Sequence, residues 1–194
     1  MGKLVEVVGP SGVGKTTLVN ALSRKARFAT AYEGHVERPF QLLFKSDTRY
    51  GLANQMDYLL LRAEQEKELR TSPWIGLMDG GLDLDYHGFT RLFHARGGLR
   101  DSEFDLCRRF YELTRQLLPL PDLIILLTAR EEIIRARLVS RQRINIVSAE
   151  DTALFNQFLD EWLATIPAER LLRLDVSNED LKFAQSLPVI LARL

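Results

Sequence analysis

The chain has 194 residues, of which 46% are hydrophobic, and this length and composition predict one domain around a single core, spanning residues 1–194. The 26 basic and 26 acidic side chains cancel, which argues against a partner such as duplex nucleic acid or an anionic membrane. A single cysteine, Cys107, excludes an internal disulfide, and no apolar run reaches membrane length, so we expect a cytoplasmic protein.

The first predicted strand, residues 3–8, runs into the segment GPSGVGKTT at residues 9–17, and a helical pattern follows it. This segment fits the pattern G-x-x-x-x-G-K-[ST], in which backbone N–H groups and the lysine hold nucleotide phosphates and the hydroxyl holds Mg²⁺. We therefore expect ATP and Mg²⁺ here, with Lys15 acting in catalysis and Thr16 as a metal ligand. The expected nucleotide-binding residues are Gly9, Ser11, Gly12, Val13, Gly14, Lys15, Thr16 and Thr17.

Further strands are expected at short apolar runs, residues 28–35, 74–79, 122–128 and 170–176. Helical patterns lie between them, over residues 51–70, 102–118 and 148–166. The first of these helices is predicted to carry an apolar stripe of Leu52, Met56, Leu59, Leu60 and Ala63. Alternation of strand and helix predicts a P-loop NTPase fold of three layers, α/β/α, with a parallel sheet of about five strands.

Two acidic residues follow predicted strands, and the carboxyl ends of parallel strands meet at one edge of the sheet. Asp79 ends the third strand, so we expect it to hold Mg²⁺ together with Thr16; the alternative is a turn aspartate before two glycines. Glu37 follows the second strand and is ionised at pH 7, so it can accept the proton of an attacking hydroxyl. The alternative for Glu37 is a surface pair with Arg38.

Two further features suit transfer of a phosphoryl group to a small molecule. Gln55, on the helix after Glu37, has an amide that can pair with the edge of a base, although it could equally be a solvated helix residue. Residues 130–143 are rich in arginine, and Arg141 and Arg143 lie where the helical pattern ends. We expect a lid over about residues 135–148 whose arginines neutralise the transferring phosphoryl group; otherwise this is a solvated helix with Glu131 and Glu132 paired to arginines.

Signatures of other nucleotide-binding classes are missing from the sequence. A GTPase switch needs N-K-x-D and a D-x-x-G after the second strand, and a transporter ATPase needs an L-S-G-G-Q-like segment. The remaining possibilities are a kinase for a nucleoside, a kinase for a nucleoside monophosphate or another small molecule, and a nucleotide-binding regulatory protein without transfer activity.

From the P-loop to about Trp162 the chain resembles the deoxyribonucleoside kinases, particularly the short bacterial deoxyadenosine/deoxyguanosine kinases. The segments that carry the resemblance are VERPF, LANQMDYLLLR, MDGGLDLDYHGF and LPDLIILLTAREEIIRARLVSRQR. The resemblance implies an ATP-dependent kinase acting on a nucleoside 5′-hydroxyl, with Glu37 as general base, Gln55 at the nucleobase and Arg141 and Arg143 in the lid. It also implies a homodimer formed through helices.

The sequence departs from this family at Gly80, where the family has an arginine that helps to hold the substrate's 5′ end. Arg38 and Arg91 are the candidates to supply a guanidinium in its place, and we include Arg38 with Glu37 and Gln55 among the predicted substrate-binding residues. The acidic residue that usually follows the lid arginines also has no counterpart in RINIV.

Overall fold

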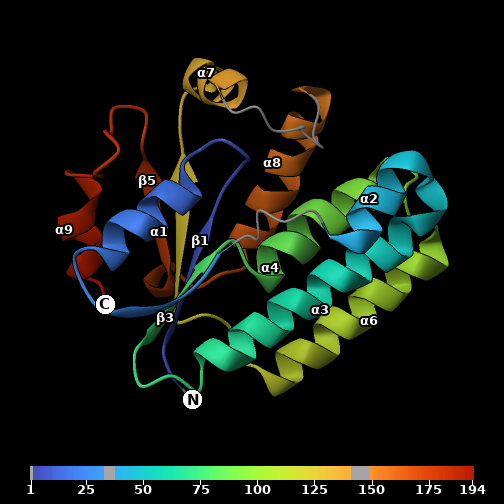
Figure 1. Ribbon diagram of the computed structural model, residues 1–194, viewed down its shortest axis with the longest axis horizontal. Coiled ribbons are helices and arrows are strands. Elements are labelled where there is room, and N and C mark those ends of the chain that lie inside the picture. The colour runs from blue at the N-terminus through green and yellow to red at the C-terminus, as the bar shows by residue number, and fades with distance from the viewer. Residues whose placement is uncertain (1, 33–37, 141–148) are drawn as a thin grey trace.

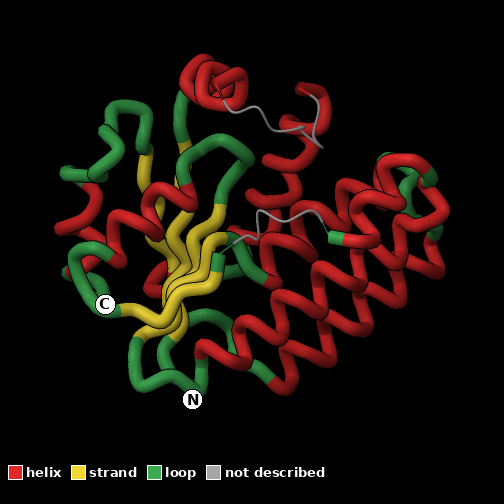
Figure 2. Tube along the Cα trace, viewed as in Figure 1, coloured by secondary structure: helices red, strands yellow, loops and turns green. Residues whose placement is uncertain are grey.

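The computed structural model describes residues 2–32, 38–140 and 149–194. Within these residues, five strands form one sheet in the order β2-β3-β1-β4-β5, and every neighbouring pair is parallel (Figure 2). The strands are β1 Leu4–Val8, β2 Phe28–Ala31, β3 Ile75–Asp79, β4 Leu123–Thr128 and β5 Leu171–Asp175. The predicted parallel α/β fold is confirmed.

Helices cover both faces of the sheet, with α1 and α9 on one side and α3, α6 and α8 on the other (Figure 1). Between β3 and α6, the α-helical segments α4 and α5 flank a π-helical turn, η2, in one continuous helix. The helical elements are α1 Lys15–Ser23, α2 Pro39–Ser46, η1 Thr48–Tyr50, α3 Gly51–Leu69, α4 Leu82–Leu84, η2 Asp85–Thr90, α5 Arg91–Ala95, α6 Asp101–Leu117, α7 Glu131–Ser140, α8 Ala149–Leu163, η3 Ala168–Arg170 and α9 Ser186–Leu191.

The period of two along the strands divides the core between the two faces. On β4, Ile125 and Leu127 pack with residues of α1 and α9, while Ile124 and Leu126 pack against Phe155 and other residues of α8. Both faces are therefore apolar, which explains why the central strands read as continuous hydrophobic runs. The carboxyl ends of β1 and β3 are left side by side, and the candidate site begins there.

A buried group of charges interrupts this apolar packing beside β1. Glu66 on α3 accepts hydrogen bonds from Arg70 (2.9 Å) and Arg115 (3.0 Å), and Arg115 also donates to Asp83 (3.0 Å). Glu6 on β1 lies next to them and accepts a hydrogen bond from the Leu84 backbone N–H (3.4 Å).

Among the described residues, the buried group holds three carboxyls, Glu6, Glu66 and Asp83, and two guanidiniums, Arg70 and Arg115. Arg70 also lies 3.9 Å from the half-exposed Asp122. Burial raises the pKa of Glu6 well above its ordinary value, and the negative charge of Asp83 raises it further. The raised pKa favours the protonated, neutral form of Glu6 in the folded protein.

This assignment predicts how stability depends on pH. Because the folded protein binds the Glu6 proton more tightly than the unfolded chain does, stability should fall as pH rises from about 4.3 toward the raised folded-state pKa. Glu6→Gln keeps the shape and stays neutral, so the variant should lose less unfolding free energy than the wild type between about pH 5 and pH 8. Denaturant unfolding at several pH values measures this.

The matched control is Glu64→Gln, which changes an exposed glutamate of α3 and should leave the pH dependence as in the wild type. Identical pH slopes for the wild type and Glu6→Gln would show that Glu6 is ionised in the folded state.

Candidate functional site

The P-loop joins the end of β1 to the start of α1, as the sequence predicts. Lys15 is buried, and its Nζ donates to the backbone oxygens of Gly9 (3.0 Å) and Pro10 (3.2 Å), so the ammonium lies over the loop. Gly9 has a φ of +140°, and a Cβ there would lie 2.5 Å from the Leu127 oxygen. Only glycine allows the loop to turn this closely against β4.

Thr16 and Asp79 are brought together by the neighbouring strands β1 and β3. The Thr16 hydroxyl donates to the fully buried Asp79 carboxylate (2.5 Å from Oγ1 to Oδ2), so both predicted metal ligands face the same point. Oxygen donors of this kind suit Mg²⁺, which usually takes one or two protein ligands and completes its shell with phosphates and water. No group of three His, Cys, Asp or Glu side chains in the described ranges forms a larger metal site.

The helix α7 and the segment after β5 border the P-loop. Arg137 on α7 donates to the Val13 carbonyl (2.7 Å) and to that of Val176 (3.4 Å), while Ile134 and Leu138 face Gly12. The arginine that the structure places on the loop is therefore Arg137, which our site prediction did not include. Sequence spacing offered a weak signal, because Arg137 precedes Arg141 by four residues in the same arginine-rich segment.

Three predicted catalytic residues, Glu37, Arg141 and Arg143, lie outside the described residues, so their roles stay predictions from the sequence. The same is true of the predicted lid from residue 141 onward. Within the described part of α7, Arg135 forms the surface ion pair with Glu131 that the alternative interpretation expects (2.6 Å).

On α3, two buried polar side chains face the helix that follows β3. Gln55 is only 3% exposed and accepts a hydrogen bond from the Thr90 hydroxyl (3.0 Å), while Arg62 is 2% exposed and donates to Asp85 (2.9 Å). Residues 55 and 62 are two helical turns apart and so share a face of α3. The alternative that Gln55 is a solvated helix residue is wrong.

Arg62 also supplies the guanidinium nearest to Gly80. A Cβ at Gly80 would lie 3.4 Å from Nη2 of Arg62. Arg38 is instead paired with Asp57, and Arg91 is paired with Glu161. Arg38 and Arg91, the two arginines proposed from the sequence, therefore do not lie as close to Gly80 as Arg62 does. The sequence signal that could have revealed Arg62 is its spacing of seven residues from Gln55, which places both on one face of a helix.

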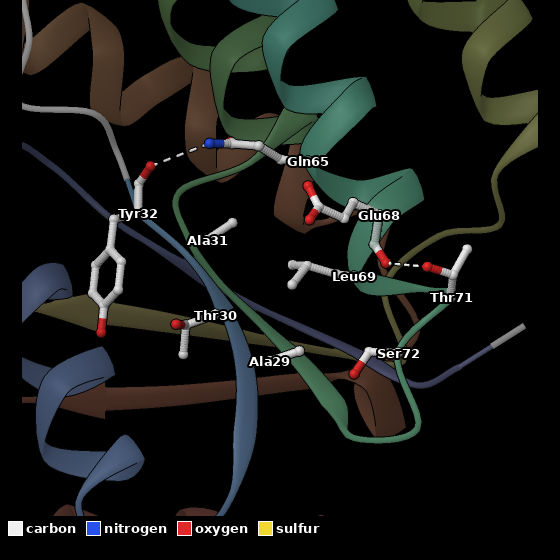
Figure 3. Close-up of a pocket in the computed structure, with 9 residues that line it drawn as sticks. All are labelled: Ala29, Thr30, Ala31, Tyr32, Gln65, Glu68, Leu69, Thr71 and Ser72. Atoms are coloured by element: carbon white, nitrogen blue, oxygen red, sulfur yellow. Dashed lines mark hydrogen bonds between the residues drawn. The ribbon is translucent and has the colours of Figure 1, made fainter.

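A separate hollow lies beside the edge strand β2 and the end of α3 (Figure 3). Gln65 extends toward β2 in this view and donates to the Tyr32 carbonyl (3.3 Å), and the Glu68 carboxylate lies near the hollow. None of the predicted site residues lines it. Its lining residues are Ala29, Thr30, Ala31, Tyr32, Gln65, Glu68, Leu69, Thr71 and Ser72.

With this geometry in place, comparison with known proteins decides the family. A family model described as deoxynucleoside kinase matches residues 5–188. The chain belongs to the deoxynucleoside kinase family. It is a nucleoside-phosphorylating kinase, and the nucleotide-binding function predicted from the P-loop follows.

Solved structures with the same fold are deoxyadenosine kinases from M. mycoides. The structure with products dCMP and a flexible dCDP has a TM-score of 0.80 and 19% identity, covering 98% of this chain and 97% of the other. The structure with dATP has a TM-score of 0.79 and 19% identity, covering 98% of each chain. The structure with dCTP has a TM-score of 0.77 and 17% identity, covering 98% and 97%. No curated protein sequence matches this kinase.

None of the helices in the described ranges has the length and apolar character that a membrane span needs.

For this kinase, Lys15→Ala should weaken nucleotide binding by roughly 10- to 100-fold, the range expected for loss of a hydrogen bond from a charged donor. The fold should persist, because in the described part of the chain the Lys15 ammonium donates to carbonyls of its own loop and to no other element. Calorimetric titration with ATP measures the affinity, and circular dichroism checks the fold. Lys25→Ala, at an exposed lysine, is the control. Unchanged ATP affinity in Lys15→Ala would contradict the P-loop assignment.

Proposed function

We propose that this kinase transfers the γ-phosphoryl group of ATP to the 5′-hydroxyl of a deoxynucleoside. The observation that carries the proposal is the juxtaposition, at the carboxyl edge of the sheet, of the P-loop with a second set of buried polar side chains. Gln55 and Arg62 on α3 meet Thr90 and Asp85, respectively, and Arg62 also reaches Gly80, which directly follows Asp79. One edge thus offers a place for a phosphate donor and a place for a polar acceptor.

The donor side fits ATP with Mg²⁺. Backbone N–H groups of the glycine-rich turn and the Lys15 ammonium are suited to the phosphate oxygens, and Thr16 and Asp79 would hold the metal. Mg²⁺ held by these two residues would supply positive charge that offsets the negative charge developing on the phosphate oxygens during transfer. Arg137 lies close enough to the loop to add positive charge beside the phosphates.

The acceptor side fits a nucleobase better than a second phosphate. Gln55 carries a donor and an acceptor on one amide, which suits a base edge. The Arg62 guanidinium is buried and paired with Asp85, so its charge is already balanced within the protein. A nucleoside monophosphate would require further cationic groups, whereas a neutral nucleoside would not. One of the M. mycoides structures holds the product dCMP, which is the monophosphate that a nucleoside acceptor gives, and this supports the acceptor class.

In this proposal Glu37 accepts the proton of the 5′-hydroxyl as that oxygen attacks the γ-phosphorus, and the bond from phosphorus to the bridging oxygen of ADP breaks. The assignment rests on the place of Glu37 in the sequence between β2 and α2. Its neighbour Arg38, which immediately precedes α2, forms an ion pair with Asp57 on α3. Arg38 borders the acceptor through this contact. Arg141 and Arg143 complete the proposal as lid residues that exclude water from the transferring group.

Glu37→Gln should cut nucleoside phosphorylation by about 10²- to 10⁴-fold, because glutamine keeps the shape but cannot accept the proton. ATP affinity should stay close to that of the wild type, since the carboxylate acts on the acceptor. Rates with deoxynucleosides, deoxynucleoside monophosphates and water as acceptors, measured alongside ATP binding, test both statements. A wild-type transfer rate in the variant would remove Glu37 from the mechanism. If the wild type transfers phosphate only to monophosphates, a nucleoside monophosphate kinase is favoured instead. If it transfers phosphate to no acceptor, a nucleotide-binding regulatory protein is favoured.

We also propose that the kinase is a homodimer joined through α6. Three leucines on this helix are exposed, Leu106 by 41%, Leu113 by 56% and Leu117 by 68%. Their spacing of seven and four residues places them on one stripe, and Leu60 on the adjacent α3 is 48% exposed. An apolar stripe of this extent on a packed helix pair suits burial against a second copy of the same stripe. The sequence resemblance implies a dimer formed through helices, without specifying which helices.

Replacing Leu113 and Leu117 together with glutamate should convert the dimer to a monomer, because like charges would face each other across the two-fold axis. Light scattering coupled to size exclusion measures the mass. Leu191→Glu changes an exposed leucine of α9, across the sheet from α6, and should stay dimeric. A wild-type monomer, or a dimer that survives the double substitution, would contradict this interface.

A further inference from the structure

Thr90 ends the π-helical turn η2 and is fully buried. Its hydroxyl oxygen lies 3.0 Å from Oε1 of Gln55 and 3.0 Å from the backbone oxygen of Asp85. Both oxygens accept from Thr90, so its one hydroxyl proton is shared between Oε1 of Gln55 and the backbone oxygen of Asp85. Thr90 thereby links Gln55, which faces the proposed base, to Asp85, which pairs with Arg62.

Thr90 fixes which end of the Gln55 amide faces the helix that follows β3. In the described part of the chain, the Thr90 hydroxyl is the hydrogen-bond partner that the structure gives to this side chain. The contact directs Oε1 toward η2, the same turn that carries the Asp85 carboxylate. Oε1 of Gln55 therefore lies on the η2 side, as the Asp85 carboxylate does, and the Gln55 NH₂ is directed away from Thr90.

This polarity matters because the two classes of nucleobase present opposite patterns. Adenine and cytosine place an exocyclic amino donor beside a ring-nitrogen acceptor, whereas hypoxanthine, guanine and thymine place an exocyclic oxygen beside a ring N–H. One amide can pair with either pattern, but only if it turns over by half a rotation. A base whose sugar is held in place for transfer cannot shift to compensate.

We propose that Thr90 is a specificity-determining residue that selects nucleosides with an exocyclic amino group over their oxo counterparts. The proposal rests on the proposed function, because it requires Gln55 to face the base of a nucleoside acceptor. The amino group donates toward Oε1 on the η2 side, and the ring nitrogen accepts from the Gln55 NH₂. An oxo base would place its oxygen against Oε1, leaving two acceptors face to face and both desolvated.

The test compares deoxyadenosine with deoxyinosine, which have nearly the same size and differ at this edge. The wild type should favour deoxyadenosine in kcat/KM by at least about tenfold, within the range that one bidentate contact supplies. Thr90→Ser keeps the hydroxyl and should hold the ratio within about threefold. Thr90→Val keeps the shape without the hydroxyl and should lower the ratio at least about fivefold, because the amide can then turn over.

Two further variants guard against nonspecific effects. Thr114→Val removes a different threonine hydroxyl, which bonds to the Phe110 carbonyl on α6 (2.8 Å), and should leave the ratio unchanged. Thr90→Ala replaces Thr90→Val if the valine variant does not fold, and the same loss of discrimination is expected from it.

An unchanged ratio in the active Thr90→Val or Thr90→Ala variant would overturn the proposal while leaving the kinase function intact. A wild type that favours deoxyinosine, or that does not discriminate, would overturn it as well. If the wild type phosphorylates no nucleoside, the proposed function itself fails and this proposal fails with it. The two failures are therefore distinguished by whether the wild type transfers phosphate to any nucleoside.

Discussion

The parallel pairing of β1 with β3 is the constraint on which the site depends. Val7 lies opposite Asp79 in the register, and the Gly80 N–H donates to the Val7 oxygen (2.9 Å). The P-loop and the Asp79 carboxylate therefore start at the same level of the sheet. A shift of one residue in this register would turn the side chain of Asp79 to the opposite face. The Thr16–Asp79 hydrogen bond then joins the first turn of α1 to the end of β3.

Burial of polar groups fixes the helices on the α3 side of this edge. A buried guanidinium or amide costs free energy unless it finds a partner, so Arg62 must meet Asp85 and Gln55 must meet Thr90. Both contacts join α3 to the helix that follows β3. Farther along α3, Glu66 accepts a hydrogen bond from Arg115 and so joins α3 to α6. The polar contacts thus specify one arrangement of elements whose apolar packing alone would be less selective.

Gly80 turns the chain directly after Asp79, beside a buried guanidinium. The residue has a φ of +72°, a conformation that side chains adopt only at a cost in free energy. The guanidinium beside it comes from Arg62 on α3, which reaches across from a neighbouring element. This geometry also makes the position sensitive to substitution, because a long side chain at residue 80 would displace Arg62 from Asp85.

The sequence by itself determined the strands, the P-loop and the strand-end position of Asp79, because each depends on local patterns of glycine, β-branched residues and charge. The family followed from motifs spread along the chain. Periodicity failed on α3, where Leu60 was predicted in the apolar stripe but is 48% exposed, while Gln55, Arg62 and Glu66 are buried. Tertiary structure alone decided the contacts of Arg62, Thr90 and Arg137, because their partners are distant in sequence and the cost of burying a polar group is offset only when those partners meet.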